Sequence, residues 1–415
     1  MANNFTPSVL AKAFAAPFPS KLQFIKNAVQ TLNPEFRAGN GATMNIVVPD
    51  YPTVVSGAVI NAGTELNYQS GVRPLTLTQK HVAFGAEQAI RSLDIISFVE
   101  QVAKPYAAAL ASDIQKQAIA EVSAQADTSV VIGSAGAIDM NKFRMAAKLI
   151  RKARSFGAEM FAIIDPMLLG QASNLANLFL PSAISEPMWK DSELGRFGGM
   201  EVFDSADCES YTAGDCDQLA AMTVTANVSE GATSIGITFG TAPTSGTTLK
   251  KGHRFNVAGI YAVDIYGNST GALYDFVAKD YTIGGVTSDD VTFDGIVTAI
   301  TVNLEKAVYA TSKPLINVSA LPAASATASS VFAAGKTYLT GLVWAKEAVY
   351  VGQARLLPMA GTESTGESNP ESGVLVSYTA GPDILNGREV GRWDWLGGWC
   401  VPRTNWVVPV YLPTT

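Results

Sequence analysis

The feature that most constrains the fold is a long block, residues 222–321, in which no helical period survives. The block is rich in Thr, Val and Gly, and turn residues separate short runs with the composition of β-strands. Short strands at such spacing are typical of an all-β module. We expect its main strands at residues 234–239, 254–260, 275–282 and 298–304. The Ala/Ser-rich tract that follows, residues 322–330, is expected to be a linker.

A long amphipathic helix is expected before this block, at residues 93–125. Ser92 is placed to cap its first turn, and Pro105 is placed to kink or restart it. Apolar residues recur at helical spacing, which gives the helix one apolar face. The residues expected on that face are Leu93, Ile96, Val99, Val102, Tyr106, Ala109, Leu110, Ile114, Ala118, Ile119 and Val122.

A second helix is expected at residues 140–156. Asp139 is placed to cap its N-terminus and Gly157 to end it. The apolar run 160–164 follows and has the pattern of a buried strand. Helix, turn and strand together predict an α/β body. The all-β block interrupts this body, and a mixed α/β pattern returns at residues 338–357.

The two ends of the chain have a different character. Residues 1–40 are punctuated by Pro and predict an extended arm with a short amphipathic stretch. Two β-like runs, residues 44–48 and 75–84, enclose a loop rich in Gly, Asn, Pro and Ser, which favours an extended β-hairpin. Further strands are expected near the C-terminus, at residues 373–379 and 406–412.

The chain of 415 residues is apolar and poor in charge. It is 47% hydrophobic and 16% charged, with a mean hydropathy of +0.17, whereas an average soluble chain carries about 25% charged residues. No apolar stretch approaches the roughly 20 residues of a spanning helix. The start lacks the pattern of a signal peptide. We therefore expect neither a membrane protein nor a secreted precursor, and we expect contacts between subunits to bury the apolar excess.

The residues that most catalytic and metal sites need are scarce. Three cysteines without a CxxC motif give no disulfide framework, and two histidines make a His-based metal site or a nucleophilic triad improbable. A net charge of -7 and a pI near 5.0 argue against a protein that grips nucleic acid through phosphate contacts. We therefore expect no catalytic residue, no cofactor, no cofactor-binding residue and no metal site.

One constellation resembles a site, and it is acidic. Carboxylates and thiolates of this kind can hold a cation, but their spacing matches neither a zinc motif nor a calcium loop. The favoured interpretation is a solvated acidic turn at a domain junction. The residues are Asp204, Asp207, Cys208, Glu209, Asp215, Cys216 and Asp217.

Weaker signals have simpler interpretations. A Gly-rich stretch, residues 39–44, lacks the third Gly and the strand–helix context of a dinucleotide site. His253 stands in a basic turn, where a phosphate or partner contact competes with a solvated loop. His81 has no evident partner in its strand, and Cys400 is expected to be a packed apolar thiol.

Three tryptophans lie close together near the C-terminus, at Trp393, Trp395 and Trp399. Such rings can stack on sugars or bases. More often they bury a large area in a core or an interface, and the negative net charge favours the interface.

In this order along the chain, the elements resemble those of the major capsid (coat) proteins of tailed double-stranded-DNA phages, and the all-β block resembles the subtype found in certain short-tailed phages. SLDII at residues 92–96 looks like the family's entry to its long helix. LGRFGGMEVFDS at 194–205 looks like its Gly-rich segment, LKKGHRFNVAGI at 249–260 like a strand pair of the inserted barrel, and the segment 391–405 like the C-terminal return strand. The Trp-rich tail and Pro105 are not family features.

The resemblance implies an α+β chain with the tailed-phage/herpesvirus-type capsid fold and an inserted small β-barrel. The implied parts are an N-terminal arm, an extended β-hairpin loop, the spine helix of a peripheral domain, an axial α/β domain, the inserted all-β domain, a return to the axial domain, and C-terminal strands of the peripheral domain. Their ranges are 1–43, 44–88, 89–130, 131–221, 222–321, 322–360 and 361–415.

The implied function is a structural protein without enzymatic activity. It would assemble with itself into pentamers and hexamers of an icosahedral virion shell that encloses double-stranded DNA, in the host cytoplasm and without a membrane. A scaffolding protein, a portal and decoration proteins would be its partners. Its weak acidity would keep the DNA from sticking to the wall. The alternative is a carbohydrate- or cell-surface-binding protein that uses the β module and the Trp-rich tail.

Overall fold

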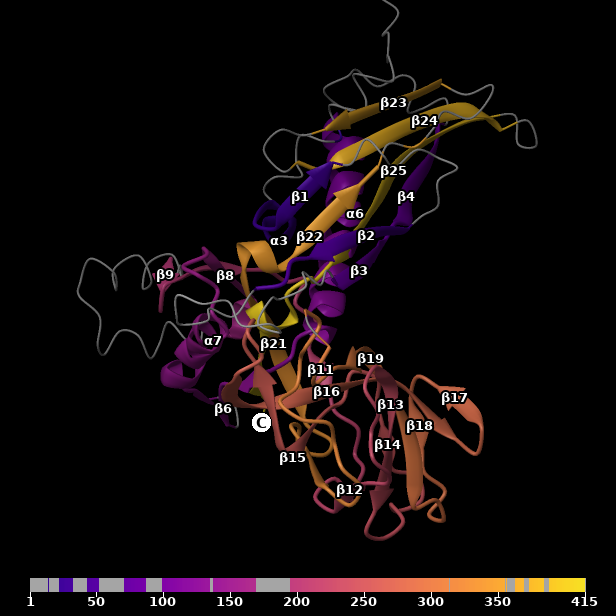
Figure 1. The fold of residues 1–415 in the computed structure, drawn as a ribbon. Helices are drawn as coiled ribbons and strands as arrows, with labels where there is room; N and C mark the ends of the chain where they lie inside the picture. The colour runs from indigo at the N-terminus through magenta and orange to yellow at the C-terminus, as the bar shows by residue number, and fades with distance from the viewer. Residues whose placement is uncertain are drawn as a thin grey trace, which may run out of the picture. The chain divides into compact units, whose positions relative to one another are not determined.

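The computed structural model describes most of the chain. The described residues are 14, 22–32, 43–51, 71–86, 99–134, 137–168, 195–312, 314–354, 356, 363–368, 373–383 and 388–414. Strands dominate among them, with two longer α-helices (Figure 1). The predicted α+β class is confirmed.

The chain divides into two units, each built from three separate stretches. Unit 1 comprises Met1–Ile46, Arg73–Ile119 and Val349–Val401, and unit 2 comprises Val47–Val72, Ala120–Ala348 and Pro402–Thr415. The chain therefore passes between the units five times.

Unit 1 contains a six-stranded sheet. Its order is β1 (Val29–Leu32), β22 (Tyr350–Gln353), β25 (Arg388–Cys400), β24 (Leu375–Asp383) and β23 (Glu363–Ser368), and β4 (Thr78–Ala86) also pairs with β25. β1 is parallel to β22, and β4 is antiparallel to β25. The strands of the N-terminal half thus join the sheet of the C-terminal half.

The N-terminal stretch expected to be amphipathic forms a short helix, α3 (Gln23–Lys26), in unit 1. Phe24 and Ile25 are buried, and the Phe24 backbone N–H donates to Gln115 Oε1 at 3.3 Å. Most of the predicted arm falls outside the described residues. The run 75–84, predicted as one strand, is divided: β3 (Gly71–Thr76) pairs with β2 (Thr43–Val48) in a separate two-stranded sheet, while β4 joins the larger sheet.

The long helix is confirmed where it is described. A π-helical turn, η1 (Val99–Ala103), leads into α6 (Lys104–Ala124). Pro105 lies in the first turn of α6, where its missing N–H costs no helical hydrogen bond. The buried face includes Leu110, Ile114, Ala118, Ile119 and Val122 as expected.

The prediction was wrong for one residue of that face: Ala109 is exposed, whereas Ala107 is buried. Residues 107, 110, 111, 114 and 118 keep the three-and-four spacing of a single stripe, whereas position 109 falls outside it. The predicted start at residues 92–96 lies outside the described residues.

Unit 2 contains a mixed seven-stranded sheet. Its order is β5 (Val130–Val131), β26 (Val407–Pro413), β21 (Thr337–Ala345), β8 (Met160–Ile164), β10 (Met200–Asp204) and β9 (Arg196–Phe197), and β11 (Tyr211–Thr212) also pairs with β21. β8, fully buried, is parallel to β10 and antiparallel to β21. β26 therefore lies in unit 2 and β25 in unit 1, which divides the range 361–415 between two sheets.

The helix α7 (Met140–Lys152) packs on this sheet against β26, β5 and β21. The Asp139 side chain accepts from the Asn141 N–H at 2.9 Å, which confirms the predicted N-cap. The helix ends at Lys152, four residues earlier than predicted. Arg154 already has a positive φ of 62°, a left-handed conformation that no α-helix can continue.

Between β11 and β21 the chain forms a second seven-stranded sheet. Its order is β15 (Arg254–Val263), β20 (Thr327–Ser330), β12 (Met222–Val224), β13 (Ala232–Phe239), β19 (Ala299–Val308), β16 (Ser269–Ile283) and β17 (Val286–Ser288). Because β15 also pairs with β16, six of the strands close into a barrel. Its core is rich in aromatic side chains, among them Phe239, Phe255 and Phe276.

The four strands predicted in this block correspond to β13, β15, β16 and β19. The prediction of a linker at residues 322–330 was wrong in its second half, because β20 lies between β12 and β15 and closes the barrel. Ala328 is fully buried there. The tract has the small residues of a linker, but these also fit where two neighbouring strands leave little room.

Two short pairs complete the described strands. β14 (Thr248–Leu249) pairs with β18 (Val291–Thr292) beside the barrel, and β6 (Gly133–Ser134) pairs with β7 (Ala137–Ile138). A short 3-10 helix, η3 (Thr404–Trp406), leads into β26.

Candidate functional site

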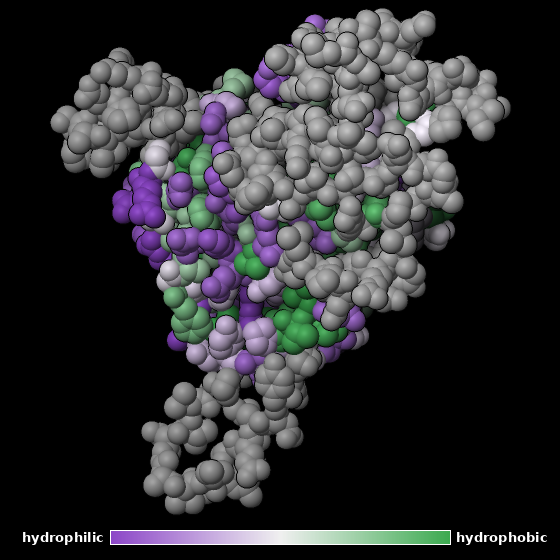
Figure 2. All heavy atoms as spheres, turned by 90° about the horizontal axis from the view of Figure 1, so that it is seen from above, coloured by the Kyte–Doolittle hydropathy of each residue, from purple (hydrophilic) through white to green (hydrophobic). Residues whose placement is uncertain are grey.

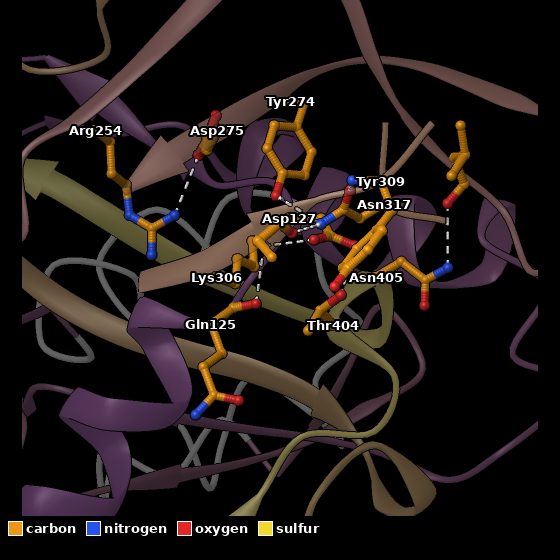
Figure 3. Close-up of polar contacts among 12 residues, drawn as sticks. Gln125, Asp127, Arg254, Tyr274, Asp275, Lys306, Tyr309, Asn317, Thr404 and Asn405 are labelled. Carbon is orange, nitrogen blue, oxygen red and sulfur yellow. Dashed lines mark hydrogen bonds and ion pairs between the residues drawn. The ribbon is translucent and has the colours of Figure 1, made fainter. Parts of the chain in front are cut away.

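The most distinctive chemical feature of unit 2 is a buried polar junction, shown in Figure 3. Side chains from the barrel meet the residues that follow helix α6 and the segment that leads into β26. Four charged groups are almost completely buried: Asp127, Arg254, Asp275 and Lys306. We call these four residues, with Thr404, the polar junction.

Lys306 and Asp127 form its first ion pair. The Lys306 ammonium lies 2.5 Å from Asp127 Oδ1 and donates to the Gln125 carbonyl oxygen at 3.0 Å. The Thr404 hydroxyl donates to Asp127 Oδ2 at 2.8 Å. The pair therefore joins strand β19 of the barrel to the end of α6 and to the C-terminal segment.

The second ion pair is Arg254 with Asp275, between the neighbouring strands β15 and β16. Arg254 Nη1 lies 3.4 Å from Asp275 Oδ2, and Arg254 Nε donates to the Tyr411 hydroxyl at 3.1 Å. The remaining Arg254 nitrogen donates to the Ser123 carbonyl oxygen near the end of α6. This guanidinium thus connects the barrel, the helix and strand β26.

The two pairs are connected through the backbone. The Asp275 N–H donates to the Asp127 carbonyl oxygen at 2.9 Å. Asn256 Nδ2 donates to Asp275 Oδ1 at 2.6 Å, and Ser129 donates to the other oxygen of the same carboxylate. Burial raises the pKa of the Asp275 carboxyl, while Arg254 and these two donors act in the opposite direction.

A polar extension reaches into the barrel from Lys306. The ammonium lies 4.8 Å from the centre of the Tyr274 ring, a favourable cation–π distance. The Tyr274 hydroxyl accepts from Asn317 Nδ2 at 3.2 Å, and Asn317 Oδ1 accepts from the Tyr309 N–H at 2.8 Å. Asn317 is itself fully buried.

The junction is built to fix segments in place. Its charges are hydrogen-bonded to each other and to backbone groups, and removing one partner of a buried pair costs about 3–5 kcal/mol because the other charge stays buried. A network of this kind holds the barrel, the end of α6 and the C-terminal segment in one arrangement.

None of these junction residues was predicted, although the sequence carries a signal for one of them. Strand β19 buries Ile300, Val302, Leu304 and Val308 in strict alternation, and Lys306 occupies a position of the same inward face. A lysine in a buried apolar face must find a carboxylate. Its partner, Asp127, is 179 residues away in the chain and cannot be read from the local pattern.

The acidic constellation has the character of a structured turn. Asp215 and Asp217 are exposed and accept from the backbone N–H and hydroxyl of Thr248 and Thr244, and these hydrogen bonds lower the pKa of both carboxyls. Cys208 and Cys216 are buried, and burial raises the pKa of both thiols. Across the described ranges, no group of three or more His, Cys, Asp or Glu side chains is placed to hold a metal ion.

The two histidines have opposite surroundings. His81 is exposed on β4. His253 is buried, so the prediction of a solvated loop was wrong for it, as was a phosphate contact at its ring. Its ring lies edge-on to Phe332 with centroids 6.2 Å apart, and neither ring nitrogen has a hydrogen-bond partner in the described part of the chain. Burial lowers the pKa of His253 to about 4.

The three tryptophans lie on one face of β25 and are buried in unit 1. Trp395 stacks on Trp399 with centroids 6.0 Å apart, and its Nε1–H donates to Gln353 Oε1 at 3.1 Å. Gly397 lies between them, and a Cβ there would approach the Trp395 ring to 2.2 Å. The rings therefore form core, so the interface favoured from the sequence was wrong, and they offer no face to a sugar or a base. Cys400 is buried in the same unit.

Among the helices of the described ranges, none combines the length and apolarity that crossing a membrane requires. The stretch at residues 39–44 falls largely outside the described residues.

No family model and no curated protein sequence matches the chain. Its fold is similar to solved structures over most of its length. A capsid structure of the cyanophage P-SCSP1u has 12% identity and a TM-score of 0.41, covering 94% of this chain and 88% of that one. The mature capsid of bacteriophage PhiM1 has 9% identity and a TM-score of 0.41, with coverages of 94% and 86%. The capsid of an empty GTA particle has 7% identity and a TM-score of 0.43, with coverages of 94% and 90%.

Proposed function

We propose that this chain is a structural shell protein that assembles with copies of itself into pentamers and hexamers of an icosahedral phage head. The observation that carries the proposal is the order of elements. A hairpin, a long helix that belongs to both units, a mixed sheet with α7, a closed barrel and final strands that return to both sheets follow one another along the chain. This is the order that the resemblance to tailed-phage coat proteins implies.

In this proposal the domain ranges keep the roles expected from the sequence. Residues 47–84 of the hairpin would lie over a neighbouring subunit, since an uncovered strand edge invites mispairing. Residues 1–40 of the arm would contact adjacent subunits, and residues 157–200 and 338–361 would line the centre of each capsomer. A scaffold, a portal and decoration proteins are the proposed partners, with assembly in the host cytoplasm around double-stranded DNA.

The proposed role of the barrel is to stabilise the subunit from within. Lys306 and Arg254, both from the barrel, bind carbonyl oxygens of Gln125 and Ser123 at the end of the long helix. These contacts are inside one chain, which supports stabilisation of the subunit rather than a bridge between capsomers.

Electron microscopy of the purified chain, alone and co-expressed with a scaffold, tests the proposal. Closed shells or capsomer rings are expected. A chain that remains a monodisperse monomer under both conditions contradicts the proposal.

The carbohydrate-binding alternative is not favoured, because the tryptophans on which it depended are buried. Replacing residues 222–330 with a short Gly/Ser linker distinguishes the shell protein from the sugar-binding protein. A shell protein loses subunit stability and particle fidelity, whereas a sugar-binding module loses glycan affinity while the remainder stays folded.

A further inference from the structure

Charge is strongly segregated within unit 2. Residues 140–154 carry six Lys or Arg and no Asp or Glu, whereas residues 197–249 carry seven Asp or Glu and no Lys or Arg. The whole chain has a net charge of only -7. Two surfaces of opposite sign are therefore present on one small part of the molecule.

The positive surface is the outward face of α7. Arg144, Lys148, Arg151 and Lys152 follow the spacing of one helical stripe, and all four are exposed. They extend over about 12 Å at 1.5 Å rise per residue. We call these four residues the cationic face. In Figure 2, hydrophilic residues gather on the side where Figure 1 places α7 and β9.

Within the part of the chain that the structure describes, the cationic face is not neutralised. No carboxylate of the described residues forms an ion pair with any of its four members, and Arg151 donates only to the Gly198 carbonyl oxygen at 3.2 Å. By contrast, Arg154 just beyond the helix pairs with Asp264 at 2.7 Å. Half-exposed Met145 lies beside the stripe and adds apolar area to it.

The negative surface is the segment of residues 201–217, which we call the acidic segment. It holds six Asp or Glu. Glu201 and Asp204 on β10 are exposed, and neither forms an ion pair with a described residue. Asp215 and Asp217 are exposed too, although Thr248 and Thr244 already bind them.

The cationic face and Glu201 lie on opposite sides of the same sheet. Phe197 is paired with Met200 in register and stacks on Phe143 of α7, with ring centroids 5.9 Å apart. Met200 therefore shares the α7 side of the sheet, since directly paired residues share a face. Successive residues of a strand point to opposite faces, so Glu201 points to the other side, whereas Asp204 shares the α7 side with Met200.

We propose that the cationic face is a docking surface for a second copy of this chain, which meets it with its acidic segment. The inference rests on the proposed function and names an interface for it. Because Glu201 and the cationic face lie on opposite sides of one sheet, a contact between them is head-to-tail, and such contacts close into rings when the rotation allows. A two-fold contact of the cationic face with itself would instead place like charges together.

Each exposed ion pair contributes little to the free energy of association, and salt screens it. Their role here is to steer copies together and to fix their register, with wrong arrangements disfavoured by like charges. Ring formation is therefore expected to weaken as the salt concentration rises.

The test is charge reversal with rescue in the full chain, read by sedimentation velocity and electron microscopy at low salt. Arg144→Glu with Lys148→Glu should weaken association at least tenfold, and Glu201→Lys on the opposite side of the sheet should weaken it too. Combining the three substitutions should restore association. The matched control, Lys279→Glu with Lys336→Glu, changes the same net charge at exposed cations outside the cationic face and should assemble like the wild type.

Thermal melting of each variant verifies folding before assembly is compared. If Arg144→Glu with Lys148→Glu assembles as the control does, the interface is wrong while the proposed function stands. Loss of binding to a 30-base-pair DNA duplex with intact assembly would instead assign the face to a polyanion, which also overturns the proposal. Failure of the combined variant to recover association overturns the acidic segment as the partner. A wild-type chain that never associates overturns the proposed function and this interface together.

Discussion

Lys306 illustrates how much a single residue contributes to the arrangement of unit 2. It occupies an inward position of strand β19, yet its charge is stabilised by groups from outside the barrel. Burying an ammonium is unfavourable unless a carboxylate and further acceptors surround it. The residue therefore fixes β19 to the segment that follows α6.

Replacing Lys306 with Met should lower the free energy of unfolding by about 3 kcal/mol, because Asp127 would remain buried without its cation. The double variant Lys306→Met with Asp127→Asn should lose less, since it removes both charges and keeps a group that accepts from Thr404. Urea unfolding of the three proteins measures this. A double variant as unstable as the sum of the single changes would contradict the ion-pair account.

His253 presents a different case, a buried imidazole without a hydrogen-bond partner in the described part of the chain. Burial lowers its pKa from 6.5 to about 4. Between these values the unfolded chain binds more protons than the folded one, so stability rises with pH. The neutral ring therefore gives its full stability above about pH 6.5, and that contribution is lost as the pH falls toward 4.

Replacing His253 with Phe should remove this dependence. The wild type is expected to lose about 3 kcal/mol relative to the variant between pH 6.5 and pH 4, from 1.36 kcal/mol per pKa unit. Urea unfolding at both pH values measures the difference. The exposed His81, changed to Asn, is the control and should leave the pH dependence of the wild type unaltered. If the wild type and the His253 variant lost the same stability between the two pH values, the account would be contradicted.

At the scale of single elements, local signals placed helix α7 correctly at one end only. Its N-terminus depends on Asp139, which lies next to the helix and acts on its own backbone. Its C-terminus was predicted at Gly157, but the chain turns left-handed at Arg154. There Arg154 binds Asp264 and lies over the Tyr266 ring at 5.0 Å. Contacts with a distant part of the chain thus ended the helix early.

Replacing Asp139 with Ala should cost about 1 kcal/mol of stability, the usual loss for an N-cap acceptor. Asp139→Asn keeps an oxygen that accepts from the Asn141 N–H and should lose far less. Chemical denaturation measures both variants. Equal losses in Ala and Asn variants would show that the cap hydrogen bond does not contribute.

The structure of strand β20 likewise depends on contacts with distant parts of the chain. The tract from which it comes has the composition of a linker, and its propensity for strand is low. It forms a strand because β12 and β15 offer free hydrogen-bonding edges on both sides. The hydrogen bonds of a sheet come from its neighbours, so the tract's own composition did not decide its structure.

At the scale of the whole molecule, the two buried ion pairs join the barrel to the rest of unit 2. Arg254 and Lys306 both donate to backbone carbonyl oxygens at the end of α6. Their side-chain partners Tyr411 and Asp127 lie outside the barrel. A barrel with its own closed core can fold as a unit, and these pairs link its unfolding to that of the mixed sheet.

The variant Arg254→Met with Lys306→Met should uncouple the two parts. Differential scanning calorimetry is expected to show one transition for unit 2 in the wild type and two in the variant. Lys346→Met removes an exposed pair with Glu159 and should leave the transitions unchanged, since exposed pairs contribute about 0–1 kcal/mol. A single transition in the double variant would contradict the coupling.

The segregation of charge changes how the acidity of the chain is understood. The hypothesis that weak overall acidity repels enclosed DNA treats the charge as evenly spread. The cationic face of α7 departs from that picture, because its positive charge is concentrated on one surface. Net charge therefore describes this molecule less well than the distribution of charge does.

The sequence by itself determined the class, the long helix, the α7 cap, the buried strand β8 and the four main barrel strands. Each follows from a repeat or a capping residue within a few positions along the chain. Only the tertiary structure decided the polar junction, the burial of His253, the strand β20 and the division of the last strands between two sheets. These depend on partners from distant parts of the chain, such as Asp127 and Lys306, whose meeting no local pattern encodes.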